Sequence, residues 1–190
     1  MKSPGEAADR ACGFSAMTEA SRADWLRVAE FDAAFAKGLP DRVLGLLRLL
    51  DDDCHGFAIN RFQHCLQAAT RAHRAGRSEQ YVVCALLHDV GAALAPAKHG
   101  EFAALILKPY VSARNHWMLR HHDVFQGYYF QHFFGGDRNA RERYRGHPHF
   151  EYTAEFCRDF DQSSFDASYD AMPLTAFEPM LRRLLSTPAI

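Results

Sequence analysis

Apolar residues recur along this chain at the three- and four-residue intervals that are typical of amphipathic helices. In residues 21–37, for example, Trp25, Val28 and Phe35 follow this spacing, and Gly38 ends it. The pattern therefore predicts a helix that begins near residue 21 and stops at the glycine.

The segment over residues 58–76 carries apolar side chains on two faces, which predicts a helix that is buried on both sides. Ser78 then provides an N-cap for a helix that runs through residues 81–89. That helix closes with a histidine and an aspartate side by side, and Gly91 ends it. Two polar residues at the end of an apolar run need hydrogen bonds, an ion partner or a metal, because burying a neutral polar group unpaired costs roughly 2–7 kcal/mol.

Further helices are predicted over residues 41–50, 99–107, 115–134, 138–145, 149–160 and 174–185. No stretch has the sustained alternation of a strand, and no internal repeat or low-complexity linker is present. We therefore expect an all-α globule of six to nine helices that forms a single domain over residues 1–190. A flexible N-terminal stretch is expected over residues 1–17.

The charges are nearly balanced, with 22 lysines and arginines against 23 aspartates and glutamates. No strong field therefore favours nucleic acid or a membrane surface, and no apolar run approaches the roughly 20 residues of a membrane span. Five cysteines without a C-x-x-C spacing fit reduced thiols better than disulfides. We expect a cytoplasmic protein whose partners are small molecules, without nucleic-acid or membrane partners.

Eleven histidines are an excess for this length, and several of them fall on separate predicted helices. The candidate chemical residues, in chain order, are His64, His88 with Asp89, His99, His121 with His122, and Asp159 or Asp161. Metal sites in helical proteins gather such side chains from several helices at one point. Imidazoles and carboxylates without a thiolate suit iron, manganese or zinc. One aspartate can bridge two cations, so this set is sufficient for two adjacent metals.

The runs QHCLQAATRA and VVCALLHDVG resemble the HD-domain superfamily, which is named for its paired histidine and aspartate. HGEFAALILKPYV and RHHDVFQGYYF resemble its oxygen-using di-iron branch, which includes myo-inositol oxygenase and organophosphonate-cleaving oxygenases. The resemblance implies the helical HD-domain fold, with a metal-site core over residues 59–161.

Carried over position by position, the resemblance also implies a ligand set. One metal is assigned His64, His88 and Asp161, the other is assigned His99 and His121, and Asp89 is the bridge. His122 is the alternative to His121, and Asp159 is the alternative to Asp161. The contexts RHHD and RDFDQ favour His121 and Asp161.

The resemblance implies a non-haem di-iron oxygenase that uses two iron ions and O2 to oxidise or cleave a small polar organic substrate. The alternative is a metal-dependent phosphohydrolase that acts on a nucleotide or another phosphate ester with manganese or another divalent metal. A third hypothesis is a ligand-binding or regulatory protein that kept the fold without turnover. We expect catalytic roles for Asp89 and Arg158. Arg158 lies three residues before Asp161 and so on the same helical face, where it could bind the substrate. An ordinary salt bridge is the alternative for Arg158.

Two features bear on the substrate. Ala92 and Phe125 replace polar or cationic residues that hold the substrates of the characterised oxygenases, which argues against copying either substrate. A run of arginines is read first as a solvated helix face and second as an anion-recognising lid; its members are Arg138, Arg141, Arg143 and Arg145.

Overall fold

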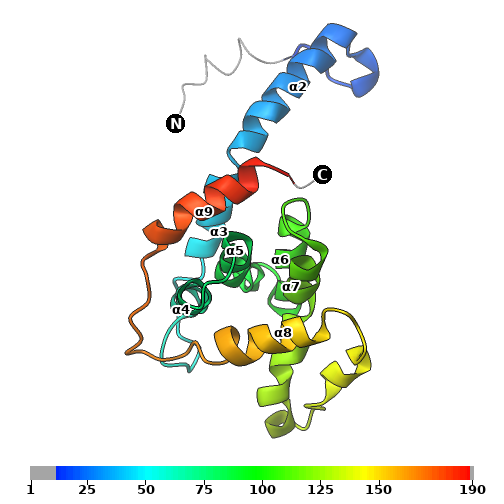
Figure 1. Cartoon of the computed structure of the whole chain (residues 1–190). Coiled ribbons are helices and arrows are strands. Elements are labelled where there is room, and N and C mark those ends of the chain that lie inside the picture. The colour runs from blue at the N-terminus through cyan, green and yellow to red at the C-terminus, as the bar shows by residue number, and fades with distance from the viewer. Residues whose placement is uncertain (1–11, 189–190) are drawn as a thin grey trace. The chain divides into compact units, whose positions relative to one another are not determined.

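A computed structural model describes residues 12–188, and Figure 1 shows its helices. The chain divides into two units, Met1–Leu39 and Pro40–Ile190. Residues 1–11 of the predicted flexible stretch lie outside the described residues. The predicted metal-site core over residues 59–161 falls within the second unit, and the expectation of a single domain stays a prediction.

The described part of the first unit contains a short 3₁₀ turn, η1 (Met17–Glu19), and the helix α2 (Arg22–Lys37). The hydroxyl of Ser21 accepts a hydrogen bond from the Asp24 N–H, and the Asp24 carboxylate accepts bonds from the Ser21 N–H and hydroxyl. This reciprocal cap satisfies backbone donors at the start of the helix. The helix predicted over residues 21–37 is therefore present, and Gly38 ends it.

The remaining α-helices are α3 (Leu39–Arg48), α4 (Arg61–Arg74), α5 (Glu79–Leu87), α6 (His99–Leu107), α7 (Ala113–Gln126), α8 (Phe150–Phe156) and α9 (Leu174–Ser186). Short 3₁₀ turns lie between them, namely η2 (Val90–Ala93), η3 (Pro96–Lys98), η4 (Gly127–Tyr129), η5 (Gln131–Phe134) and η6 (Ala140–Tyr144), and a π-helical turn, η7 (Cys157–Asp161), follows α8. Within residues 12–188 there are thus eight α-helices and no strand, which confirms the predicted all-α fold.

The helix α5 lies at the centre of the second unit, where it contacts α4, α7 and α9 (Figure 1). All its residues from 81 to 87 are buried, as expected for a helix that is apolar on every side. The side chain of Ser78 caps α5 by accepting a hydrogen bond from the Tyr81 N–H, as predicted. The helix α4 buries residues on two faces, which confirms the prediction made for residues 58–76.

Two predicted helices are shorter or tighter than expected. The helix predicted over residues 115–134 ends at Gln126 and continues as the turns η4 and η5, where aromatic residues with poor helix propensity dominate. The segment predicted as a helix over residues 138–145 forms only η6. Its predicted start, Asp137, accepts a hydrogen bond from the Asn139 N–H, and such local side-chain bonds compete with helix formation.

None of the helices within residues 12–188 is both long enough and apolar enough to cross a membrane.

The end of α5 meets the start of α6 at Gly91. A Cβ atom on this glycine would lie 2.6 Å from the backbone oxygen of His99 and 2.9 Å from its Cα. Such distances are below ordinary van der Waals contact, so only glycine lets the two backbones approach this closely. The position of His99 relative to the end of α5 therefore depends on Gly91.

We expect Gly91→Ala to destabilise the protein by roughly 1–3 kcal/mol, because the added methyl group forces the backbones of η2 and α6 apart. Gly45→Ala is the matched control, since Gly45 is exposed on α3 and nothing lies within 4 Å of its Cβ position. That control should be neutral or stabilising, by roughly 0.5–1 kcal/mol. Urea denaturation of both variants measures the difference; equal stabilities would contradict the close approach.

Candidate metal centre

His64 lies in the first turns of α4 and is buried. The side chain of Asn60 caps this helix by accepting a hydrogen bond from the Gln63 N–H. His64 Nδ1 lies 2.9 Å from the backbone oxygen of Ser164, a residue that follows η7 in the chain. This contact brings the start of α4 beside the segment that contains Asp161.

His88 and Asp89 follow the last residue of α5. His88 keeps helical angles, whereas Asp89 has φ −99° and ψ 4°, in the sparsely populated bridge region where many active-site residues lie. The change of backbone direction lets both side chains reach the same space, with His88 Nε2 3.8 Å from Asp89 Oδ1. Both residues are buried.

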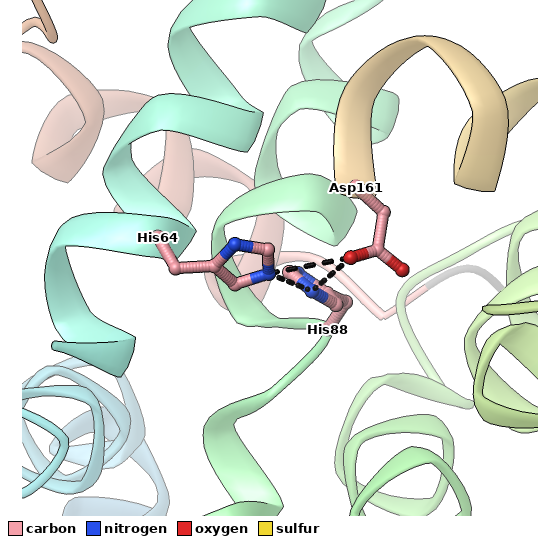
Figure 2. Close-up of side chains that lie close together, drawn as sticks. All are labelled: His64, His88 and Asp161. Carbon is pink, nitrogen blue, oxygen red and sulfur yellow. Dashed lines mark hydrogen bonds and ion pairs between the residues drawn. The ribbon is translucent and has the colours of Figure 1, made fainter. Parts of the chain in front are cut away.

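Three buried side chains from different elements point toward one another, as Figure 2 shows: His64 from α4, His88 after α5 and Asp161 from η7. The Nε2 atoms of the two histidines are 3.0 Å apart. Asp161 Oδ1 lies 3.3 Å from His64 Nε2 and 3.7 Å from His88 Nε2. One donor atom from each residue therefore faces a single point.

A second cluster lies on the other side of Asp89. Asp89 Oδ1 is 3.3 Å from His99 Nε2 and 3.4 Å from His122 Nε2. Its Oδ2 atom faces the first cluster, at 4.0 Å from His64 Nε2. Asp89 Oδ1 also lies 3.8 Å from His88 Nε2, and His88, Asp89 and His122 form a second group whose atoms could hold a metal. Asp89 therefore lies between the imidazoles of both clusters, as expected of a bridging ligand.

The hydrogen bonds of the four rings fix where their lone pairs lie. Each Nδ1 atom lies within 2.7–3.0 Å of a backbone oxygen; the pairs are His64 with Ser164, His88 with Ala85, His99 with Pro96, and His122 with Leu119. A carbonyl oxygen can only accept, so each Nδ1 must carry the proton. Each Nε2 of a neutral ring is then an acceptor that faces the carboxylates, as in histidines that bind a metal.

This arrangement fits a cation. Two lone pairs that face each other at 3.0 Å, as on His64 and His88, repel unless a proton or a metal lies between them. Asp161 Oδ2 is buried and has no hydrogen-bond partner in residues 12–188. Proteins rarely leave a buried carboxylate oxygen unsatisfied, so the site has both the donor atoms and the orphan oxygen that a metal would use.

The carboxyl groups of the site are charged. Burial opposes the ionisation of Asp161, but hydrogen bonds with His64 and His88 outweigh it and hold the pKa far below its ordinary value. Burial likewise opposes the ionisation of Asp89, and the electrostatic interaction with the neighbouring His88 ring contributes most to lowering that pKa. Burial also opposes the protonation of His64, yet Asp161 raises the pKa of the imidazole. Protons and metal ions therefore compete for the same Nε2 atoms.

Arg61 and Gln126 contact the centre and were missed by sequence reasoning. Arg61 Nη1 lies 2.7 Å from Asp89 Oδ2, and the guanidinium side chain is 39% exposed. The signal was available, because Arg61 precedes His64 by three residues and so shares its helical face. Gln126 donates from Nε2 to Asp161 Oδ1 at 3.0 Å, a contact between distant segments that no local pattern reveals.

The structure differs from the preference for His121. His122 faces the cluster, whereas His121 stacks on Trp117 with ring centroids 4.2 Å apart and donates from Nδ1 to the Trp117 carbonyl. Adjacent residues on an α-helix point in different directions, so only one of the pair can face Asp89. The signal that would have selected His122 was its position three residues after the apolar Leu119, whereas His121 lies only two residues after it.

Asp161 lies in the centre and Asp159 does not, in agreement with the preferred assignment. The expected role of Arg158 is not supported by its position, because its guanidinium is 61% exposed and pairs with Asp159. The reason is η7: hydrogen bonds in a π-turn join residues i and i+5, so positions three apart no longer share a face as they do in an α-helix.

A cavity of about 980 Å³ opens onto the centre and is lined by His64, Asp89, His99, His122 and Asp161. Of the arginine run, Arg143 lines this cavity, while Arg138 and Arg141 lie over the ring of Tyr128 at 4.3 and 3.7 Å from its centroid. Phe125 is fully buried in the core and does not reach the cavity lining.

Imidazoles and carboxylates that several helices bring to one buried point could hold divalent metal ions. The sequence profile of the HD domain matches residues 61–158, about half of the chain, and the chain therefore belongs to the HD-domain family. Members of this family are typically metal-dependent phosphohydrolases or oxygenases that bind divalent metals. A search of curated proteins finds no match. The resemblance to the superfamily is thus confirmed.

The two neighbouring histidines provide a test of the geometry. We expect His122→Ala to weaken binding of one of two metals by at least roughly tenfold, because an imidazole facing Asp89 is lost. His121→Ala should bind both metals normally, since its ring stacks on Trp117. Elemental analysis after anaerobic loading with ferrous iron measures the metal content. Equal losses in the two variants, or loss only in His121→Ala, would contradict this arrangement.

Proposed function

We propose that this chain is a binuclear non-haem iron oxygenase that uses O2 to oxidise or cleave an organic substrate. The observation that carries the proposal is the position of Asp89, whose Oδ1 atom lies 3.3–3.8 Å from the Nε2 atoms of His88, His99 and His122 and whose Oδ2 atom lies 4.0 Å from His64 Nε2. This geometry supports two metals that share one carboxylate. The first would be held by His64, His88 and Asp161, and the second by His99 and His122.

The donor chemistry supports iron. Four imidazole nitrogens and two carboxylates suit iron or manganese better than the soft thiolate sites of structural zinc. Burial raises the pKa of the Cys65 and Cys157 thiols well above the ordinary value, so these neighbouring sulfurs stay protonated. When bound, two irons supply the electrons and the Lewis acidity with which O2 is activated.

The residues of the chain then have distinct roles. The backbone carbonyls of Ala85, Pro96, Leu119 and Ser164 hold the four rings in one tautomer and orientation. Gln126 orients Asp161 by donating to its Oδ1. Arg61 neutralises Asp89 Oδ2, and its partly exposed guanidinium lies where it can hold an anionic group of a substrate.

The cavity favours the oxygenase over the phosphohydrolase. Among its lining residues the only cationic side chains besides histidine are Arg61 and Arg143, and the acidic Asp123 and Asp137 lie in the same lining. A nucleotide or polyphosphate needs more positive charge or a cradle of backbone amides.

A phosphohydrolase is the second candidate, and the observation that favours it is the Arg61 guanidinium beside Asp89. Arginine binds phosphate through two parallel hydrogen bonds, and a metal-bound water would attack phosphorus. This candidate needs no redox-active metal and no O2.

One experiment separates the two candidates. The protein is loaded anaerobically with ferrous iron, partly oxidised, examined by electron paramagnetic resonance, and then tested for O2 uptake with a pool of small organic acids and alcohols. We expect a mixed-valent di-iron signal and O2 uptake that depends on iron. The phosphohydrolase becomes the first candidate if the manganese form hydrolyses phosphate esters without O2 and the iron form takes up no O2.

We expect Asp89→Asn to lower the affinity for both metals by roughly 100-fold or more, because the amide carries no charge and bridges poorly. Arg158→Ala is the control. It should leave metal content and O2 uptake unchanged, because Arg158 pairs with Asp159 outside the cavity. Metal titration and an oxygen electrode measure both effects. A variant at position 89 that retains one tightly bound metal would show that Asp89 is not shared.

A further inference from the structure

One wall of the cavity is aromatic. It is formed by Tyr129, Phe130, Phe133 and Phe134, which belong to the turns η4 and η5 or lie between them. These turns follow α7 directly, so the wall begins a few residues after His122. The chain thus places a row of apolar rings beside the centre that it builds on α7.

Two rings of this wall are exposed to a degree that packing does not explain. Phe133 is 76% exposed and Phe134 is 81% exposed, although both line the cavity. Large apolar side chains that are exposed around a cavity typically mark a ligand-binding groove, because water contact with each ring is unfavourable until a ligand covers it.

A second group of aromatic rings in the lining reaches the metal ligands. The ring of Phe57 stacks on Phe165 with centroids 4.9 Å apart, and Phe165 stacks on His64 at 4.4 Å. All three residues line the cavity. An apolar surface therefore extends without interruption from a predicted metal ligand to the exposed ring of Phe57.

The cavity volume of about 980 Å³ lies at the upper end of the range for small-molecule sites, roughly 300–1,000 Å³. A small polyol or a short phosphonate fills a minor part of this space and leaves the aromatic rings in water. The metal ligands and Arg61 offer a polar head a binding point, and the aromatic rings offer contact to hydrocarbon. Gln131, Asp137 and Arg143 also line the cavity.

We propose that the substrate is amphipathic, with a hydroxylated anionic head that binds at the metals and Arg61 and a hydrocarbon tail that lies against the aromatic rings of the lining. This inference rests on the proposed function, because the head group is assigned to the metal centre. It differs from the expectation of a small polar substrate, because the tail would fill most of the cavity.

The experiment uses 2-hydroxy acids of increasing chain length, namely glycolate, 2-hydroxyhexanoate and 2-hydroxydecanoate, titrated calorimetrically into the anaerobic, metal-loaded protein. We expect the affinity to rise roughly fourfold for each methylene group that enters the cavity. A phenyl-bearing 2-hydroxy acid of similar apolar area distinguishes an aromatic tail from an aliphatic one, and tighter binding of either than of glycolate supports the proposal.

The variant Phe133→Ser with Phe134→Ser should weaken binding of 2-hydroxydecanoate at least roughly tenfold and leave glycolate binding unchanged. Leu105→Ser is the matched control, because Leu105 is 72% exposed on α6 and is absent from the cavity lining. Because Phe133, Phe134 and Leu105 are all exposed, we expect both variants to fold. The metal content of each variant is measured in parallel.

The outcomes separate this inference from the proposed function. If two metals bind but all acids bind equally, or none binds, the tail proposal is overturned and the metal centre stands. If chain length raises affinity in protein that never retains two metals, the tail site is supported and the proposed function fails. A loss of affinity in Leu105→Ser as large as in the phenylalanine variant would also overturn the tail site.

Discussion

The hydrogen bond between His64 Nδ1 and the carbonyl of Ser164 joins segments that are far apart in the sequence. It brings the segment that carries Asp161 against α4, so that the first and last predicted ligands meet. The other three rings are held by carbonyls only three residues earlier in the chain, as His88 is by Ala85. Local backbone geometry thus orients three imidazoles, and one long-range bond completes the centre.

This arrangement is costly without a cation. Two buried carboxylates, Asp89 and Asp161, face one guanidinium from Arg61 and several imidazole lone pairs. Buried charge without compensation is strongly unfavourable, so either protons on the rings or metal ions must be present. The fold nevertheless holds the groups together, because Gly91 lets α5 and α6 meet and Gly100 lies directly against the ring of His122. Close packing at these two glycines therefore brings the ligand-bearing elements together.

Most of the fold could be predicted from the sequence, because helical periodicity, the cap at Ser78, and the adjacent His88 and Asp89 are local signals. The choice of His122 over His121 was also within reach, since His122 lies three residues after the apolar Leu119 and His121 only two. Other features depend on tertiary structure. The π-turn that moves Arg158 away from Asp161, and the short turns that place aromatic rings beside the cavity, have no comparable local pattern.

The central claim is that Asp89 lies between two metal ions. Anomalous diffraction at the iron edge, from crystals loaded anaerobically with ferrous iron, tests it directly. The account predicts two peaks roughly 3.5–4 Å apart, one beside each Asp89 oxygen. The first should lie against His64, His88 and Asp161, and the second against His99 and His122. A single peak, or peaks remote from Asp89, would contradict the shared carboxylate on which the proposed chemistry depends.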